Sequence, residues 1–186
     1  IGRPGAGLCP VRGHSNVQGD RTMGIFEKPP AALLDALEAE FDLSLPREAG
    51  HDVVETIRAM RDGDIEVFMA MGGNFARATP DTRLTEAVLT QVPFSVHVST
   101  KLNGTHAWTG ETSLILPALG RTERDDQVTG PQVVTVEDSM GMVHGSRGRL
   151  APGGDLRAEV SIGCELGRRL VPAVPWQQWE GDYSAI

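Results

Sequence analysis

The stretch IEVFMAMGGNFARATPDTRLTEAVLTQVPFSVHVST, residues 65–100, decides the fold. It begins with a short, mostly apolar run that enters paired glycines (65–73), a pattern typical of a buried parallel strand. Residues 79–92 then predict a helix, with Thr79 as its cap and Pro80 at its first position. PFSVHVST (93–100) predicts the next strand. A strand, a helix and a second strand in this order favour a right-handed parallel unit.

The flanking segments continue this alternation. Helices are predicted over 27–43, where two prolines suit the first turn, and over 51–64, where Asp52 can cap the helix and Gly63 can end it. Strands are predicted at SLILP (113–117) and PQVVTVED (131–138), and a last helix over 155–170. The predicted fold class is therefore α/β, a three-layer αβα domain with a mostly parallel, Rossmann-like sheet.

Composition excludes several classes of protein. The chain has 186 residues and a formal net charge of −8, and its only lysines are Lys28 and Lys101, so neither nucleic-acid binding nor an anionic membrane surface is expected. The apolar runs are far too short for membrane insertion, and no signal peptide is visible. Cys9 and Cys164 form no CxxC pair, so we expect neither a metal framework nor a disulfide, and a cytoplasmic setting fits best.

Polar residues follow the predicted strands at the ends where a parallel sheet binds ligands. The first such set is Gly72, Gly73 and Asn74, and the second is Ser99, Thr100, Lys101 and Asn103. Glycines allow close approach of a ligand to the backbone, and the amides and hydroxyls can bind it. These residues fit a nucleotide-binding rim and ordinary turns equally well. No GxGxxG or GxxxxGK[ST] motif is present, which disfavours a conventional NAD site or P-loop.

Other reactive residues form no recognisable constellation. His97 lies inside a strand pattern and is expected to be a core histidine, whereas His106 could be a turn residue or a ligand contact. No Cys/His cluster supports a zinc site, and no GxSxG elbow supports a hydrolase. The charge run at 123–126 is typical of a solvated loop.

The opening segment CPVRGHSNVQGDRTMGI, residues 9–25, has almost no apolar periodicity, so we expect no regular secondary structure there. In an extended chain Arg12 and His14 would face the same side. An arginine fork binds a small oxyanion well, and a histidine can move a proton. The alternative is a linker with chance polar residues, which the residues alone favour.

These segments together resemble a known family. CPVRGHSNVQGDRTMGI is similar to the RGxxNVQG…MG segment of molybdopterin oxidoreductase catalytic (alpha) subunits, in the formate-dehydrogenase-like branch of the dimethyl-sulfoxide-reductase superfamily. VFMAMGGNFARATPD resembles the family's strand–MGxNxxxxxPD–helix, and VHVSTKLNGTHAWTGETSLILPALGRTERD resembles its following strands and loops. The resemblance continues through DSMGMVHGSRGRLAPGGDLRAEVSIGCEL and so covers roughly residues 9 to 170.

The resemblance implies a role for particular residues. Arg12 and His14 would be catalytic, with Arg12 orienting an anionic substrate; His14 stands where formate-specific enzymes commonly have glutamine. The chain would hold part of a bis-molybdopterin guanine dinucleotide carrying molybdenum. The implied cofactor contacts are Asn16, Gln18, Gly72, Gly73, Asn74, Ser99, Thr100, Lys101, Asn103, Glu123, Arg124 and Glu159. Thr100 replaces the family's aspartate, so the guanine contact is expected from another residue.

The resemblance also implies an organisation for the chain. Residues 1–28 would be a cofactor-proximal loop segment, 29–170 the dinucleotide-binding domain and 171–186 a tail leading to further chain. We interpret the chain as a segment of a longer enzyme. Its expected partners are the remaining domains of the catalytic subunit, a small-molecule substrate and an electron-transfer subunit. The metal ligand and an iron–sulfur cluster would lie upstream, so the segment alone is expected to be inactive. The alternative is a non-catalytic α/β module that binds a nucleotide or another subunit.

Overall fold

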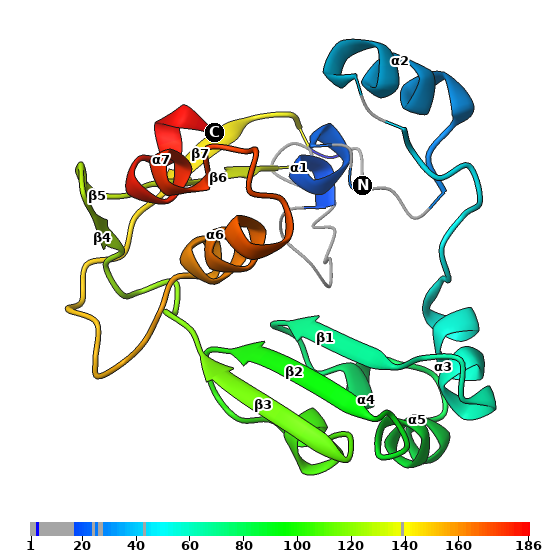
Figure 1. The fold of residues 1–186 in the computed structure, drawn as a ribbon. Coiled ribbons are helices and arrows are strands. Elements are labelled where there is room, and N and C mark those ends of the chain that lie inside the picture. Colours follow the sequence, from blue (N-terminus) through cyan, green and yellow to red (C-terminus); the bar gives the residue numbers. More distant parts are fainter. Residues whose placement is uncertain (1–2, 4–16, 24, 26–27, 43, 139) are drawn as a thin grey trace.

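A three-stranded parallel sheet organises the molecule. The computed structural model describes residues 3, 17–23, 25, 28–42, 44–138 and 140–186. The strands are β1 (Val67–Met71), β2 (Phe94–Ser99) and β3 (Thr112–Pro117), in the order β1-β2-β3. All neighbours run parallel, and Met69, Val96 and Leu114 stand side by side across the sheet. The predicted α/β class with a parallel sheet is confirmed (Figure 1).

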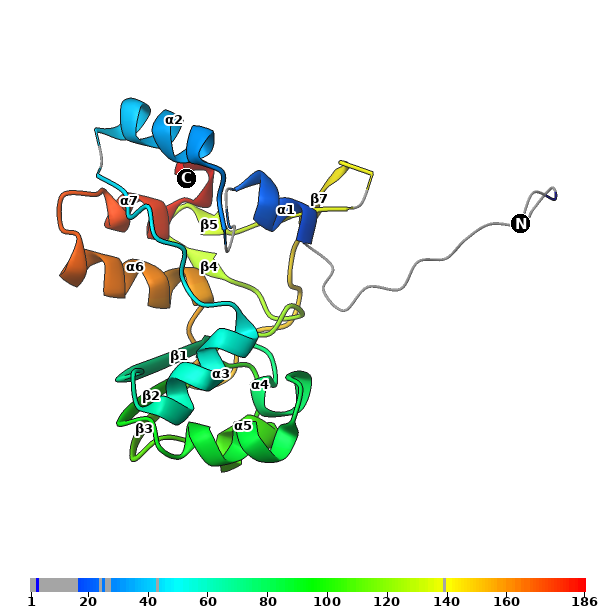
Figure 2. The same ribbon diagram turned by 90° about the vertical axis from the view of Figure 1, so that its right-hand side faces the viewer.

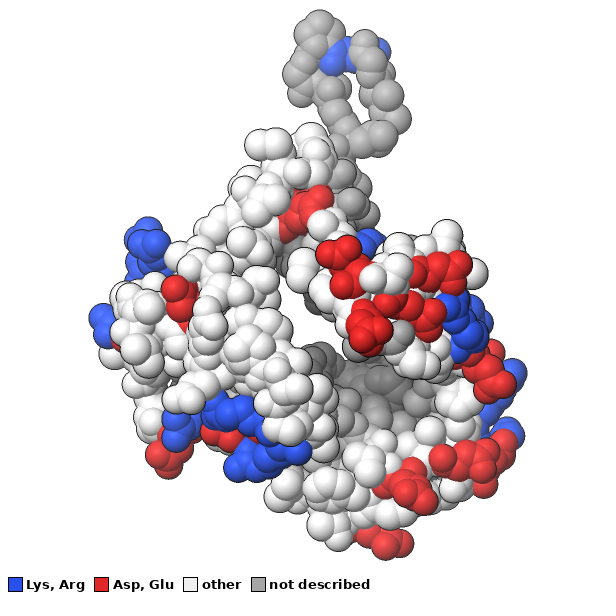
Figure 3. Space-filling model, turned by 45° about the horizontal axis from the view of Figure 1, so that its top comes forward, with Lys and Arg blue, Asp and Glu red and all other residues white. Residues whose placement is uncertain are grey.

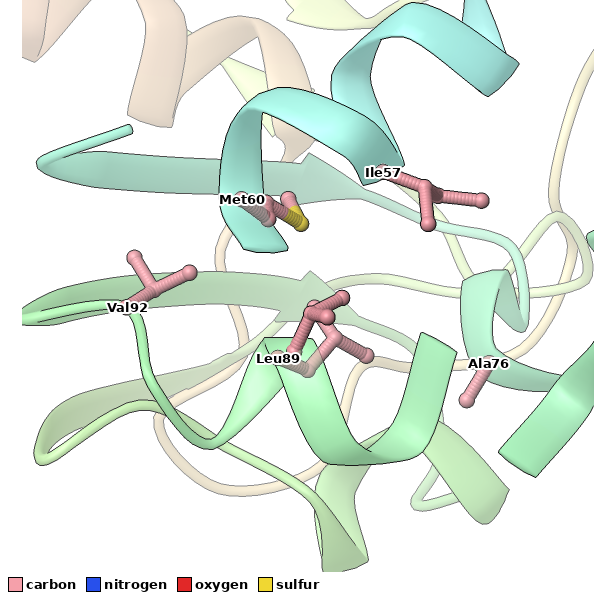
Figure 4. Packing of buried hydrophobic residues seen from close by; sticks show 6 residues of the cluster. Ile57, Met60, Ala76, Leu89 and Val92 are labelled. Atoms are coloured by element: carbon pink, nitrogen blue, oxygen red, sulfur yellow. The ribbon is translucent and has the colours of Figure 1, made fainter. Parts of the chain in front are cut away.

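Helices α3 (Val53–Asp62), α4 (Phe75–Ala78) and α5 (Thr82–Leu89) build the core against one face of the sheet. Figure 4 shows side chains from α3 and from the end of α5 converging on a cluster of buried residues: Ile57, Met60, Ala76, Val88, Leu89 and Val92. The predicted limits of α3 are confirmed. Asp52 and Glu55 form a reciprocal capping box, and Gly63 ends the helix with a φ of 82°.

The beginning of α5 differs from the prediction. Asp81, not Thr79, caps the helix by accepting a hydrogen bond from the Leu84 backbone N–H at 3.1 Å. The Thr79 hydroxyl instead donates to the Phe75 carbonyl, so it closes the preceding turn. Thr79 and Asp81 are both suitable N-cap residues. The sequence alone does not show which of the two caps the helix.

Helix α6 (Glu159–Leu170) lies on the opposite side of the sheet from α5, as both ribbon views show (Figures 1 and 2). A cavity of about 470 Å³ separates it from the sheet, with Met69, Val96 and Leu116 on the sheet side and Ile162 and Leu166 on the helix side. The third layer is therefore incomplete. The prediction that residues 65–73 form a buried strand is wrong for this face, because Met69 is 42% exposed.

A second group of elements follows β3. It contains the hairpins β4 (Asp126–Gln127)–β5 (Gly130–Pro131) and β6 (Val134–Glu137)–β7 (Val143–Ser146), and then helix α7 (Trp176–Gly181) and a 3₁₀ turn (Tyr183–Ala185). The strand predicted within 131–138 exists as β6, but it pairs antiparallel with β7 and does not join the parallel sheet. Glycine 141, with a φ of 75°, permits the tight hairpin turn that makes this local pairing available.

Two helices lie among the described residues before α3. Helix α1 (Val17–Thr22) corrects the expectation that 9–25 has no regular structure; Thr22 Oγ1 donates to Glu137 Oε2 of β6 at 2.7 Å. Helix α2 (Ala31–Phe41) matches the helix predicted over 27–43, yet it has no buried residue. Arg47 joins it to the following segment through ion pairs with Asp35 and Glu38.

The surface charge and the lengths of the helices concern the expectations about nucleic-acid binding and membrane insertion. On the face drawn in Figure 3, acidic and basic side chains gather in separate small groups, and no broad positive surface is seen there. Among the described residues, no helix combines the length and the apolar character that crossing a membrane requires.

Candidate functional site

The carboxyl ends of the three parallel strands meet at one edge of the sheet. After β1, the Gly72 backbone N–H donates to the Val98 carbonyl of β2 at 2.8 Å, and the Ala118 N–H after β3 donates to the Ser99 carbonyl at 3.0 Å. Gly72 and Gly73 have φ values of 69° and 72°, a conformation that glycine adopts without strain. The two glycines therefore turn the chain sharply away from the sheet directly above the neighbouring strand.

A hydrogen-bond network ties the first two strand-end loops together. Asn103 Nδ2 donates to the Gly73 carbonyl at 2.7 Å, and Thr105 Oγ1 donates to Asn74 Oδ1 at 3.0 Å. Ser99 Oγ donates to the Lys101 carbonyl at 2.7 Å. Five of the predicted residues thus lie together: Gly73, Asn74, Ser99, Lys101 and Asn103. Some of their hydrogen-bonding groups are already used to hold the two loops in place.

The two histidines near this network have structural partners. His97 is buried and its Nε2 lies 3.1 Å from Ser95 Oγ, which confirms the core histidine. Burial, with a smaller contribution from the charge of His106, lowers the pKa of His97 below its usual value. His106 Nδ1 accepts the Asn103 backbone N–H at 2.9 Å and so completes the cap of the 3₁₀ turn Gly104–Ala107.

A pocket of about 400 Å³ opens beside these loops, between the end of β2, the loop after β3, the β6–β7 hairpin and the start of α6. Three of the predicted residues line it: Thr100, Glu123 and Glu159. Gly72 adjoins it, because a Cβ built on Gly72 would lie 4.0 Å from Glu159 Oε1. Residues far apart in the sequence therefore converge on one hollow, which we call the strand-end pocket.

Glu123 is fixed on the wall of this pocket by its own loop and by the segment that follows β7. Its Oε2 accepts the Gly120 backbone N–H, and the Arg124 N–H donates to the Leu150 carbonyl at 2.7 Å. Gly148 packs flat against the Glu123 peptide, since a Cβ there would lie 1.8 Å from the Glu123 carbonyl oxygen. Only glycine fits at this crossing, so the two loops form one wall.

Four further polar residues, which no sequence motif singled out, line the pocket: Arg121, Asp125, Gln132 and Ser146. Arg121 Nε donates to Ser146 Oγ at 3.2 Å and is the only basic residue among the described lining residues. The charge run 123–126 is not simply solvated. Glu123 and Asp125 are half-buried, whereas Arg124 and Asp126 are exposed and pair with each other at 2.7 Å. This burial alternates with a period of two, as in an extended chain, although all four residues are charged in the sequence.

Asp125 is held from behind by the C-terminal elements. The Tyr183 hydroxyl donates to Asp125 Oδ2, and Gln127 Nε2 donates to Asp125 Oδ1 at 2.7 Å. Gln127 Nε2 also lies 3.2 Å from Ser161 Oγ in the first turn of α6. Burial, and then the bond to Asp125, raise the pKa of Tyr183 well above its usual value. Tyr183, near the C-terminal end of the sequence, therefore supports the wall of the pocket.

The start of α6 forms another side of the pocket. Ala158, Glu159 and Val160 line it, and the N-cap Ala158 offers no side-chain hydrogen bond to the first turn. The first N–H groups of a helix have no partner within the helix, and they carry partial positive charge. This side of the pocket can therefore accept an anionic group.

Several predicted residues do not reach the strand-end pocket or cannot be placed. Arg124 turns away to Asp126, and Asn103 and Lys101 lie in the neighbouring loop network. Gln18 belongs to α1, but its side chain is outside the description. Arg12, His14 and Asn16 lie outside the described residues. Within the described ranges, no three His, Cys, Asp or Glu side chains cluster in a way that could hold a metal ion.

Comparison with known proteins gives relatives but no matching family model. The whole chain is 58% identical to a protein of Mycobacterium tuberculosis named "Uncharacterized oxidoreductase" and 47% identical to Protein YdeP of Escherichia coli. It covers 24% and 25% of these relatives. Over 70% of the chain it is 27% identical to a Staphylococcus aureus protein named "Putative formate dehydrogenase", of which it covers 14%. The chain is thus homologous to proteins named as oxidoreductases and spans about a quarter of the length of the relatives it matches over its full length.

Proposed function

We propose that this chain is the cofactor-binding part of a molybdenum oxidoreductase related to formate dehydrogenases. In this proposal the strand-end pocket holds the guanosine end of one molybdopterin guanine dinucleotide. The observation that carries it is the convergence of Thr100, Glu123 and Glu159, from three separate segments, on one pocket at the carboxyl edge of a parallel sheet. The oxidoreductase names of the relatives support the same class of reaction.

The size of the pocket fits one nucleotide half of the cofactor. Pockets for small ligands usually have volumes of roughly 300–1,000 Å³, and this one has about 400 Å³. That space suits a nucleoside with its phosphate, and the remainder of a dinucleotide would extend outward along the loops that carry Gly73 and Asn74. Both glycines have positive φ values, and their lack of a side chain allows a bulky group to approach the backbone there.

The chemistry of the lining residues fits the same group. Guanine and ribose present N–H and O–H donors, and the carboxylates of Glu123, Asp125 and Glu159 are acceptors. Phosphate groups require positive charge, and the uncapped start of α6 and the Arg121 guanidinium offer it at the same pocket. The pocket therefore combines acceptors for a base and sugar with an anion-binding side.

The proposed reaction takes place outside the strand-end pocket. When bound, the molybdenum centre would supply two-electron exchange with the substrate. In the proposal, Arg12 binds an anionic substrate through its guanidinium fork and His14 holds or moves a proton beside it. The isolated 186-residue segment would hold the cofactor weakly and show no turnover by itself.

The experiment compares charge-neutral variants in the full-length protein, produced in a molybdate-fed host. Glu159→Gln and Glu123→Gln keep the side-chain shape but remove an ionised acceptor. Glu111→Gln is the matched control, because Glu111 is exposed at the opposite end of β3. Bonds to charged groups contribute about 1.5–3 kcal/mol each, so the first two variants should release bound nucleotide at least about tenfold faster.

Release is measured as dinucleotide and molybdenum passing into the filtrate during mild heating, with the dinucleotide quantified as GMP after acid hydrolysis of the filtrate. Faster release from Glu159→Gln and Glu123→Gln, with Glu111→Gln unchanged, supports the proposal. Equal rates in all variants would remove the pocket as the nucleotide site. A wild-type protein that contains neither molybdenum nor GMP would favour the alternative, a binding module without redox chemistry.

A further inference from the structure

Strand β3 is apolar on both faces and uncovered on both. Leu114 is 48% exposed and Ile115 is 41% exposed, and consecutive residues of a strand point to opposite faces. In β2, which lies between two strands, the residues from His97 to Ser99 are buried. The core cluster comes from α3, α4, α5 and Val92, with Phe68 of β1 packed against it, and contains no residue of β3. The helical layers therefore leave Leu114 and Ile115 uncovered, although α6 faces Leu116 across the cavity.

The outer edge of β3 is open over most of its length. At its C-terminal end Arg157 forms a parallel bridge, with its N–H donating to the Pro117 carbonyl at 3.4 Å and its carbonyl accepting the Leu119 N–H at 2.9 Å. The strand order ends at β3, so among the described residues no strand pairs with the edge from Thr112 to Leu116. Residues Thr112 to Leu116 carry no charge, and the only proline is Pro117 at the end. Edge strands of folded proteins are usually protected by charged side chains, bulges or prolines within the strand. An uncharged strand that is apolar on both faces is typical of the interior of a parallel sheet.

We propose that the sheet continues beyond β3 in the longer polypeptide. A strand from outside residues 1–186 pairs with the outer edge of β3, and the elements attached to it cover Leu114 on one face and Ile115 on the other. The length of the relatives supports this occupant, because about three quarters of their chain lies outside the region matched here. This inference does not depend on the proposed cofactor.

The same cover would complete the second face of the sheet. Met69 and Leu114 stand on either side of Val96 on this face, and both are more than 40% exposed. They form an apolar surface beside the 470 Å³ cavity under α6. A layer packed on Leu114 would also reach this surface, which one helix now covers only in part.

A second copy of the same chain is a weaker occupant. Two copies related by a two-fold axis would join β3 to β3 antiparallel. That contact would satisfy the edges, but it would leave Leu114 and Ile115 of both copies without helices above and below. Only an occupant that brings its own layers removes both apolar side chains from water.

The test measures side-chain accessibility in the full-length protein. Leu114→Cys and Ile115→Cys are labelled with iodoacetamide, and modification at each position is read by peptide mass spectrometry. Val128→Cys is the control, since Val128 is 92% exposed in a loop. Both β3 variants should be labelled at least about tenfold more slowly than the control, because a covered site reacts only through local opening. A smaller difference overturns the proposal.

Two further measurements keep the test decisive. All three variants should react at one rate in denaturant. Hydroxyl-radical footprinting of the wild-type protein, which needs no substitution, should show low oxidation of Leu114 and Ile115 relative to Val128, and high oxidation would contradict the proposal. Protection that disappears when dilution converts a dimer to a monomer would also contradict it, because the cover would then be a second copy.

Discussion

Replacing Gly148 by alanine should open the wall of the strand-end pocket. The new Cβ would lie 1.8 Å from the carbonyl oxygen of Glu123, 2.2 Å from its carbonyl carbon and 2.9 Å from the Arg124 nitrogen. Carbon–oxygen contacts are usually about 3.3 Å or longer. The two loops must therefore separate by about 1.5 Å, estimated from that contact limit.

The cost of this movement is high because the clash is with backbone on both sides. Overpacking typically costs about 1–3 kcal/mol. We expect about 3 kcal/mol, the upper end of that range, because the bonds from Arg124 N–H to the Leu150 carbonyl and from Leu150 N–H to the Thr122 carbonyl must adjust together. For a domain of 150–250 residues that unfolds by itself this corresponds to a fall in Tm of roughly 6–12 °C, and a larger cooperative unit in the full-length protein would show a smaller fall.

The assay is thermal unfolding of the full-length protein, combined with hydrogen exchange of peptides that cover 119–125. Gly153→Ala is the control, because a Cβ there meets nothing within 4 Å. Gly148→Ala should lower Tm and increase exchange in the 119–125 loop, whereas Gly153→Ala should change neither. An unchanged Tm and unchanged exchange in Gly148→Ala would refute the packing of these two loops.

Three further predictions concern single side chains. Tyr183→Phe removes the hydroxyl that donates to Asp125 and should lower the free energy of unfolding by about 1.5–3 kcal/mol. Thermal unfolding measures this change, and a variant as stable as wild type would contradict the prediction. The raised pKa of Tyr183 adds stability that is complete below the unfolded value of about 10, so wild type should lose more stability than Tyr183→Phe as pH rises above it. The pKa of His97 is lowered, so its contribution to the free energy of unfolding is complete above the unfolded pKa of 6.5 and is lost as pH falls through the folded pKa. In His97→Gln, Tm should therefore change less between pH 7.5 and 5.5 than in wild type. The same pH dependence of Tm in both proteins would contradict this. The hydrogen bond from the Glu55 backbone N–H lowers the pKa of Asp52, so this cap stabilises α3 above the unfolded pKa of 3.8, and the stabilisation is lost as pH falls through the folded pKa. Asp52→Ala should therefore destabilise the protein at pH 7 but much less near pH 3, as measured by denaturant unfolding.

Local signals were sufficient for most of the parallel unit. The order of β1, α5, β2 and β3, and the limits of α3 between Asp52 and Gly63, follow from period, cap and glycine residues. The burial of β1 was not predictable in the same way. Its residues are apolar on both faces, but burial depends on which layers are present, and one face of β1 is only partly covered.

Some residues of the candidate site were predictable from the sequence, and others were not. Thr100, Glu123 and Glu159 were identified from strand ends and from the resemblance, and the structure brings them to one pocket. Asp125 and its partner Tyr183 were missed because their contact joins segments 58 residues apart. Long-range contacts of this kind leave no period in the sequence, and the uniformly charged run 123–126 does not distinguish the half-buried Glu123 and Asp125 from their exposed neighbours.

The central claim is that the strand-end pocket receives a guanine nucleotide attached to a metal-carrying pterin. The most direct measurement is a structure of the full-length protein purified from a molybdate-rich culture. The account predicts density for a guanosine within hydrogen-bond distance of Glu123, Asp125 or Glu159. A cofactor whose nucleotide lies elsewhere, with this pocket filled by another part of the polypeptide, would contradict it.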